Sequence, residues 1–158
     1  FSTKKLGEEI VPVAKLSDQK QDAILHNYYT TKLLERLLQR ISTETGLSSN
    51  ELIVIHYLNC FPHSNVTKDM SLFTDINQFL LVPLLEKLLF NEYVTRDKSS
   101  DFETYYSLSQ KAESITKQLN QLSQDFDSIR FAGIDPSTQE LLQTTEETIY
   151  ENIRKKLL

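Results

Sequence analysis

The apolar residues of this chain recur mostly at the spacing of α-helices. In residues 18–45 they fall in pairs about every four positions, which places one wide apolar stripe along a long helix that ends before Gly46. Ser48, followed three residues later by Glu51, has the spacing of a capping box, and residues 51–61 are then apolar on nearly all sides. The pattern therefore predicts a long amphipathic first helix and a buried second helix.

A short helix, a turn and a further helix follow. Thr67 is placed to cap the short helix, and Asp75 lies in the turn. The further helix spans Asn77–Asn91 and contains Pro83. Because proline removes a backbone hydrogen bond, this helix either starts near Gln78 and bends at Pro83 or starts at Pro83 itself. We expect the bent helix, since Asp75 with Gln78 three residues later resembles a capping box.

The pattern changes after Asn91 from helical to extended. Residues 93–97 and 102–109 both have the character of strands, and the polar residues 98–101 separate them. This arrangement predicts a β-hairpin. A helix pair followed by such a hairpin has the layout of a winged helix-turn-helix.

The rest of the chain returns to helical spacing. From Leu108 to Ile129 the apolar residues alternate spacings of four and three, which is a heptad-like seam and usually has a helical partner. Asp135 and Pro136 are placed to cap and begin a last helix that runs to the end of the sequence.

These elements predict a mainly α-helical protein with one small β-hairpin. We expect a winged helix-turn-helix domain at 47–108, a helical dimerisation region at 18–46 and 109–158, and an N-terminal arm at 1–17. The sequence begins at Phe rather than Met, which suggests a trimmed chain. The expected dimer contacts are apolar residues of the last two helices: Leu119, Leu122, Phe126, Leu141, Ile149 and Ile153.

Three segments resemble the MarR family of bacterial transcriptional regulators. They are LSSNELIVIHYL at 47–58, LLEKLLFNEYVTR at 84–96 and YYSLSQKA at 105–112, and ELIVIHYL is also similar to the Sar-type subgroup. The resemblance covers nearly the whole chain from residue 18. It implies an obligate homodimer that binds duplex DNA with a recognition helix and a wing from each subunit. It also implies a cleft for a small-molecule effector, and no cofactor.

Two features depart from that family's pattern, one in the recognition helix and one in the wing. The early recognition-helix positions, usually Ser, Thr and Arg, are Phe79, Leu80, Val82 and Pro83, and Glu103 stands where a wing arginine is expected. Residues 65–111 carry five basic and seven acidic side chains, a net charge of −2. A surface that binds several phosphates normally needs more positive charge.

Two functions remain open from the sequence. The first is a DNA-binding regulator, whose candidate contacts are the polar and basic residues of the helix pair and wing: Lys68, Asn77, Gln78, Lys87, Arg96 and Lys98. The second is a winged-helix dimer that has lost sequence-specific reading and binds a protein partner through Phe79, Leu80 and Val82. Alternatively, these three side chains fill the core or the dimer interface.

Other candidate chemistry is weaker. His56, Cys60 and His63 have a spacing compatible with metal ligands, but their apolar surroundings favour core packing, and we expect no metal site. His26, Tyr28 and Tyr29 are candidates to line the effector cleft, although aromatic residues at helical spacing more often pack in a core or dimer. The sequence holds no nucleophile elbow, phosphate loop or dinucleotide fingerprint, so we do not expect an enzyme.

Charge and hydropathy bear on the compartment. The formal net charge is −5, so any affinity for nucleic acid must come from a local patch. No run approaches 18 uninterrupted apolar residues, and the first twenty residues lack the apolar core of a signal peptide. We therefore expect a cytoplasmic protein without a membrane partner.

Overall fold

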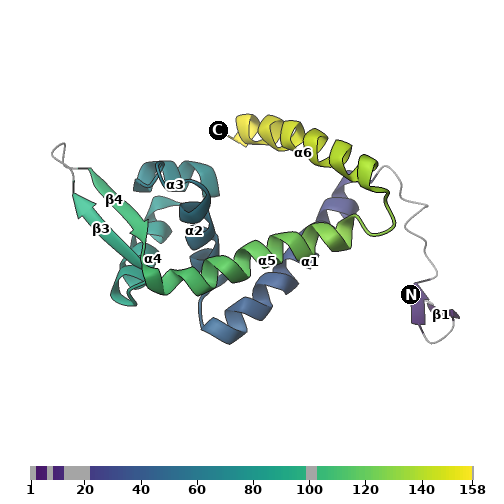
Figure 1. Ribbon diagram of the computed structural model, residues 1–158, viewed down its shortest axis with the longest axis horizontal. Helices are drawn as coiled ribbons and strands as arrows, with labels where there is room; N and C mark the ends of the chain where they lie inside the picture. The colour runs from purple at the N-terminus through teal and green to yellow at the C-terminus, as the bar shows by residue number, and fades with distance from the viewer. Residues whose placement is uncertain (1–2, 7–8, 13–21, 99–102, 158) are drawn as a thin grey trace. The chain divides into compact units, whose positions relative to one another are not determined.

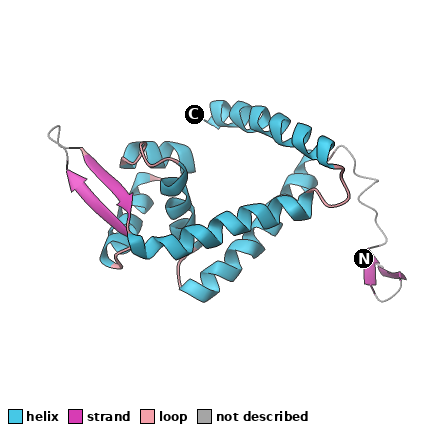
Figure 2. Cartoon of the chain, viewed as in Figure 1, coloured by secondary structure: helices cyan, strands magenta, loops and turns pink. Residues whose placement is uncertain are grey.

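The computed structural model describes residues 3–6, 9–12, 22–98 and 103–157 (Figure 1). Its elements are, in chain order, β1 (Thr3–Leu6), β2 (Glu9–Pro12), α1 (Ala23–Thr45), α2 (Ser49–Cys60), α3 (Thr67–Thr74), α4 (Gln78–Phe90), β3 (Val94–Lys98), β4 (Thr104–Leu108), the 3₁₀ turn η2 (Gln110–Ala112), α5 (Glu113–Arg130) and α6 (Pro136–Leu157). The predicted fold class is confirmed: helices dominate, and a hairpin follows the helix pair (Figure 2). None of the described helices is both long and apolar enough to cross a membrane.

The chain divides into two contact units, residues 1–36 and 37–158. In the first unit, β1 and β2 pair antiparallel, with Thr3 opposite Pro12 and Leu6 opposite Glu9. The predicted arm therefore contains a hairpin that the sequence did not reveal. Its β-branched residues, which include Ile10 and Val11, favour extended backbone, but four-residue strands are too short to show a clear alternation.

Helix α1 begins where the side chain of Asp22 caps it. The backbone N–H of Leu25 donates to the Asp22 carboxylate at 2.9 Å. This bond satisfies one of the amide groups that the first turn of a helix leaves unpaired. The predicted start at residue 18 lies outside the described residues.

Helix α2 is central to the core of the second unit. It contacts α3, α4, β4 and α5. Its residues Leu52, Val54 and Ile55 are fully buried, which fits a helix that is apolar on nearly all sides. The neighbouring elements contribute further fully buried side chains: Met70, Leu81, Leu85, Leu88 and Ala112.

The start of α2 follows the predicted capping box. The Ser48 hydroxyl accepts a hydrogen bond from the Glu51 backbone N–H at 3.1 Å, and Glu51 Oε1 accepts one from the Ser48 backbone N–H at 3.4 Å. Two otherwise unpaired amides of the first turn are satisfied in this way.

The predicted cap of α3 is wrong by one residue. Val66 is the N-cap and Thr67 is already helical. The physical reason lies in the preceding residue, because Asn65 is tied to the wing: its side chain donates to the Tyr106 carbonyl at 2.8 Å, and its carbonyl accepts from the Tyr106 N–H at 3.0 Å. Contacts to β4, rather than a local side-chain cap, hold the entry to α3.

Helix α4 starts at Gln78 and contains Pro83, as the preferred alternative predicted. Its cap is not the predicted pair of Asp75 and Gln78. Asp75 adopts a left-handed conformation, φ 57°, at the end of α3, and Asn77 caps α4 by accepting a hydrogen bond from the Phe79 N–H at 2.8 Å. A residue that ends one helix in this conformation is not available to cap the next.

The wing is the antiparallel pair β3 and β4, in which Val94 lies opposite Leu108 and Lys98 opposite Thr104. Val94 and Tyr106 are buried, which fixes one face of the hairpin against the helices. The wing tip, residues 99–102, lies outside the described residues.

Candidate nucleic-acid interface

Helix α4, at the recognition-helix position, has two different apolar faces. Leu81, Leu85 and Leu88 are fully buried and hold the helix against the core. Phe79 is 89% exposed and Phe90 86% exposed, and Leu80 and Val82 are exposed as well. The sequence left open whether Phe79, Leu80 and Val82 form an exposed docking surface or fill the core or dimer interface. The structure excludes the core of the subunit.

Five of the exposed residues of α4 form one continuous strip. At about 100° per residue, Phe79, Val82, Pro83, Glu86 and Phe90 fall within one sector of α4, and the strip rises about 16 Å along the helix. We call these five residues the outer face of α4. It contains no basic side chain and one acid. A helix that reads base edges normally presents polar and basic groups there.

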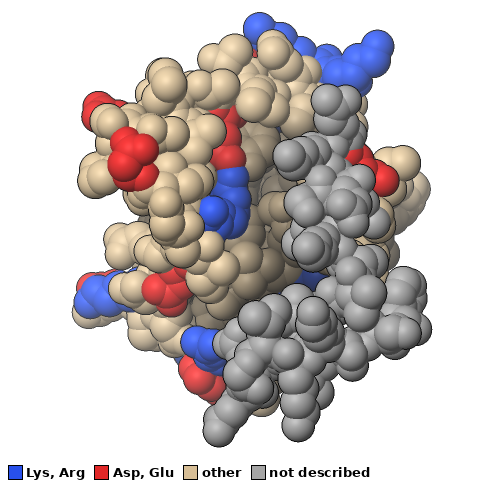
Figure 3. All heavy atoms as spheres, turned by 90° about the vertical axis from the view of Figure 1, so that its right-hand side faces the viewer, with Lys and Arg blue, Asp and Glu red and all other residues tan. Residues whose placement is uncertain are grey.

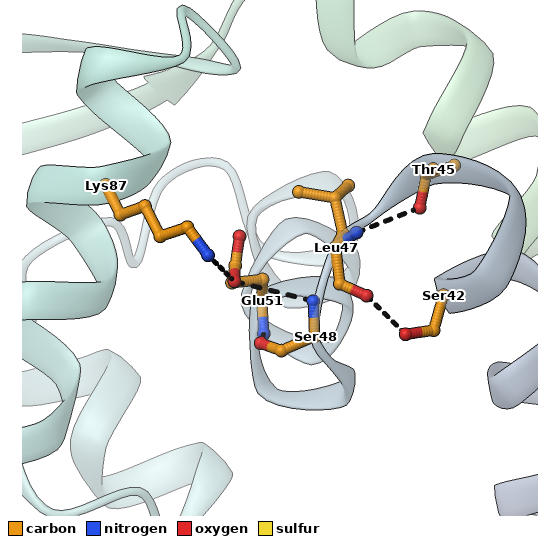
Figure 4. A network of polar contacts seen from close by, with 6 residues as sticks. All are labelled: Ser42, Thr45, Leu47, Ser48, Glu51 and Lys87. Atoms are coloured by element: carbon orange, nitrogen blue, oxygen red, sulfur yellow. Dashed lines mark hydrogen bonds and ion pairs between the residues drawn. The ribbon is translucent and has the colours of Figure 1, made fainter.

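Lys87, a predicted DNA contact, forms an ion pair with another helix of the same subunit (Figure 4). Its Nζ lies 3.0 Å from Glu51 Oε1, and the Glu51 side chain is only 4% exposed. A buried carboxylate without a counter-charge is costly, so this lysine stabilises the capped start of α2. The other carboxylate oxygen of Glu51 has no hydrogen-bond partner among the described groups. The spacing of the capping box revealed Glu51 but could not reveal that Lys87, on another helix, compensates its charge.

Arg96, on β3, pairs with Glu86 of the outer face of α4 at 2.8 Å. Both side chains are largely exposed, and such a pair contributes little to stability. A phosphate can therefore compete with Glu86 for the guanidinium at small cost.

The remaining predicted contacts lie at the edges of the helix pair and wing. Lys68 is exposed in the first turn of α3, Gln78 is exposed at the start of α4, and Lys98 is exposed at the end of β3. Asn77 is exposed too, but its side-chain oxygen is occupied by the cap of α4. Figure 3 is seen from the right-hand side of Figure 1 and does not display these contacts; on the face that it draws, a basic group lies at the upper edge, and acidic and basic side chains are mixed over the rest.

The histidine and cysteine residues of α2 form a packed pair. Cys60 Sγ lies 3.5 Å from His56 Nε2, and His63 is exposed in the turn beyond the helix. Burial lowers the pKa of His56 and raises the pKa of the Cys60 thiol, so the structure favours neither an imidazolium nor a thiolate. Among the described residues, no group of three or more ligating side chains is placed to hold a metal ion.

The aromatic residues of α1 lie on one helix surface. Tyr28 and Tyr29 line a shallow depression with Lys32, Leu33 and Arg36, and the Lys32 ammonium lies 5.3 Å from the centre of the Tyr28 ring. His26 is not among the lining residues. All the lining residues belong to α1.

A second depression was not predicted and lies between α3 and the end of α6. We call it the Tyr57 depression; it has a volume of about 230 Å³ and is lined by Tyr57, Ser64, Asp69, Leu72, Phe73, Asp75, Arg154 and Leu157. Burial and the nearby Asp69 carboxylate raise the pKa of Tyr57, whose hydroxyl donates to the Ser64 carbonyl at 2.6 Å. No local sequence signal joins residues so far apart in the chain.

The predicted dimer contacts differ in burial. Leu119 and Leu122 of α5 are buried, and Leu122 lines a groove with Leu37 and Ile41 of α1. Leu141, Ile149 and Ile153 of α6 are all exposed, and none of the described side chains of α6 is buried. Phe126 is half-buried, with the Arg130 guanidinium 4.9 Å from its ring centre.

Comparison with solved structures decides the fold. A MarR-family regulator from Silicibacter pomeroyi matches 89% of this chain and 97% of its own, with a TM-score of 0.71 and 17% identity. The chain has the MarR fold. A SlyA-like regulator from Listeria monocytogenes matches 87% of this chain and 92% of its own, with a TM-score of 0.73 and 11% identity.

A third similar structure with the MarR fold contains nucleic acid. It is a putative MarR-family regulator from Listeria monocytogenes in complex with a 26mer DNA, and it matches 85% of this chain and 91% of its own, with a TM-score of 0.71 and 12% identity. Neither a protein-family model nor a curated protein sequence matches the chain. The MarR fold is thus recognised from its architecture.

Proposed function

We propose that the protein is a homodimeric, MarR-like transcriptional regulator that binds duplex DNA. The observation that carries the proposal is the fold shared with a regulator in complex with DNA, over 85% of this chain. Each subunit would place α3, α4 and the wing on one half-site, and occupancy of the site would repress transcription.

Phosphate contacts would supply most of the affinity. Lys68 and Lys98 present exposed ammonium groups, and Arg96 exchanges its exposed partner Glu86 for a phosphate. The backbone amides at the start of α4 provide a further anion-binding group. Base reading would rest on Gln78 and the amide group of Asn77, because the outer face of α4 offers no donor to base edges.

The dimer would form through the exposed apolar side of α6. Leu141, Ile149 and Ile153 are exposed in the single subunit, and Tyr28 and Tyr29 of α1 are exposed as well. Exposed apolar residues at regular helical spacing are typical of helices that pack against another subunit. A two-fold dimer also matches the symmetry of a pseudo-palindromic site.

A small-molecule effector would alter the spacing of the two recognition helices. His26, Tyr28 and Tyr29 remain the candidates from the sequence, and the Tyr57 depression adds a second candidate beside α3. A ligand there would act directly on the first helix of the pair.

Binding to a mixed-sequence duplex at several salt concentrations tests the proposal. If several lysine and arginine residues replace counterions on the phosphates, the logarithm of the association constant falls linearly with the logarithm of salt concentration, by about 0.9 per contact. Neutralising Lys68 and Lys98 to Gln should make the slope shallower. Absence of binding at low salt, or a flat response to salt, would contradict a DNA-binding function.

A second candidate function is a protein-interaction module with the same fold. The observation that favours it is the outer face of α4, where exposed Phe79 and Phe90 flank Val82 and Pro83. Large apolar side chains gathered on one exposed helix face are typical of docking surfaces.

The double substitution Phe79→Ser and Leu80→Ser separates the two functions. A docking module would lose capture of its partner from an extract of the source cells, whereas a DNA-binding regulator would keep its affinity for duplex DNA. The matched control, Lys68→Gln with Lys98→Gln, should have the opposite pattern. Unchanged capture by the Phe79 and Leu80 variant would argue against docking.

A further inference from the structure

The last turn of α6 carries three consecutive basic residues, Arg154, Lys155 and Lys156. The first of them lies on α3, with its guanidinium 4.6 Å from the centre of the Phe73 ring. Leu157 lines the Tyr57 depression together with Phe73. The end of α6 therefore lies against the first helix of the helix-turn-helix pair, in the same subunit.

The two lysines are turned away from that contact. Successive residues of a helix are about 100° apart, so Arg154 and Leu157 share the side that meets α3, and Lys155 and Lys156 lie on the other sides. Both lysines are exposed, and neither takes part in the ion pairs of the described residues of α6. Asp69 and Asp75 also line the depression, and the Arg154 guanidinium offsets part of their negative charge.

The winged domain itself is short of available cations. Lys87 is paired with buried Glu51, and Arg96 can contact a phosphate only by leaving Glu86, so Lys68 and Lys98 are the main cations left for DNA. DNA affinity depends on the number of phosphates that lysine and arginine residues neutralise. Cations next to α3, supplied from outside the winged domain, would compensate for this shortage.

We propose that Lys155 and Lys156 contact the phosphate backbone of duplex DNA beside α3, as a basic extension of the winged helix-turn-helix. Measured along the axis of α3, the Arg154 contact at Phe73 is about 8 Å from Lys68, and the two residues are about 140° apart around that helix. Phosphate contacts carry no sequence information, so the extension adds affinity for any duplex. This inference rests on the proposed DNA-binding function.

The test is the salt dependence of binding by the full chain with Lys155→Gln and Lys156→Gln, on a mixed-sequence duplex of roughly 30 base pairs, or about three turns. The matched control is Lys5→Gln with Lys117→Gln, which makes the same change in net charge at a lysine of β1 and at an exposed lysine paired with Glu113. The expected result is a log–log slope shallower by about one to two per subunit and a roughly tenfold loss of affinity at low salt, with the control unchanged. Lys155→Arg with Lys156→Arg should restore both.

Three other outcomes have distinct meanings. If the wild-type protein binds with a steep salt dependence and the Lys155 and Lys156 variant has the same slope, the extension is wrong and the proposed function stands. If the salt slope of the control decreases as much as that of the variant, the decrease is caused by the change in net charge, and the extension is again wrong. If the wild-type protein does not bind the duplex, the proposed function and the extension fail together.

Cations at the end of a helix also interact favourably with the helix dipole. Such a purely structural role would lower the thermal stability of the variant and leave the salt slope intact. A changed slope at unchanged helix content therefore supports contact with DNA.

Discussion

Helices α2 and α6 place their apolar side chains in opposite environments. In α2, six of twelve residues are buried, and they include Leu52, Val54 and Ile55. In α6, none of the described side chains is buried, although Leu141, Ile149 and Ile153 recur along it. Within one subunit, α2 gains most from burial of apolar surface, whereas α6 is held mainly by its own backbone bonds, the ion pair of Arg130 with Glu146 and a few contacts at its ends.

The difference follows from how the apolar residues are distributed around each helix. Residues 51–61 are apolar on nearly all sides, so α2 is stable only when other elements surround it. The sequence of α6 has an apolar stripe on one side and many polar residues on the others, so a single packing surface is enough. The first pattern indicates the centre of a domain, and the second indicates a helix that packs against a second subunit.

The largest expected effect comes from the core around α2. Replacing fully buried Leu52 by Ala should lower the free energy of unfolding by about 2–5 kcal/mol, because a cavity adds to the lost burial. Urea denaturation gives this value. The same truncation of exposed Leu141 should change subunit stability by less than about 0.5 kcal/mol at concentrations where the protein is monomeric. Similar losses at both positions would remove the contrast between the two helices.

The next effect concerns the outer side of α6. Changing Ile149 and Ile153 to Ser should raise the dimer dissociation constant at least roughly 100-fold. A dimer contains each residue twice, and each side chain is already about half buried in the subunit, so its further burial is worth about half of the 1.5–3 kcal/mol of a fully buried side chain. Analytical ultracentrifugation measures the shift. The helix content of the variant and of the wild-type protein should be the same at concentrations where both are monomeric. A dimer of unchanged affinity would place the interface elsewhere.

A smaller effect should come from Lys87. Its change to Met leaves the Glu51 carboxylate buried without its counter-charge, and unfolding should become easier by about 1–2 kcal/mol, less than for a fully buried pair because the Lys87 side chain is 58% exposed. The matched change Arg96→Gln breaks an exposed pair and should cost at most about 0.5 kcal/mol. If Lys87→Met weakens DNA binding and leaves stability unchanged, Lys87 contacts DNA instead.

Local signals in the sequence predicted where most helices begin and end. The capping box at Ser48 and Glu51 depends on neighbouring residues and is confirmed. The start of α4 at Gln78 is also confirmed, but its cap is Asn77 and not the predicted Asp75. The predicted cap at Thr67 failed because Asn65 is held by Tyr106, a residue distant in sequence. The sequence thus predicted the elements and their order, but not the contacts between distant residues that determine where an element begins.

The candidate site shows the same limit. The sequence identified the apolar start of α4, and the structure adds that Phe79, Leu80 and Val82 are exposed. The sequence alone could not reveal that Lys87 pairs with Glu51 or that Arg154 lies on Phe73, because both contacts join residues far apart in the chain. Charge counts along the sequence therefore overestimate the cations available to DNA.

The smallest expected effect concerns the start of α6, which depends on a local cap. Hydrogen bonds from the Ser137 side chain and from the side chain and backbone of Thr138 lower the pKa of Asp135 to about 2, from 3.8. A lowered pKa in the folded protein means that the ionised carboxylate stabilises the helix start fully above pH 3.8, and that this contribution is lost as the pH falls through about 2.

Glu51 in the cap of α2 also pairs with Lys87 of α4, whereas the Asp135 side chain is fully exposed. Protonation of Asp135 should therefore affect α6 alone. Asp135→Asn keeps a cap without the charge and should remove this part of the pH dependence. Far-ultraviolet circular dichroism, compared between the wild-type protein and the variant, isolates it from the other carboxylates. Identical acid profiles would mean that α6 does not depend on its cap, and that another contact holds its first turn.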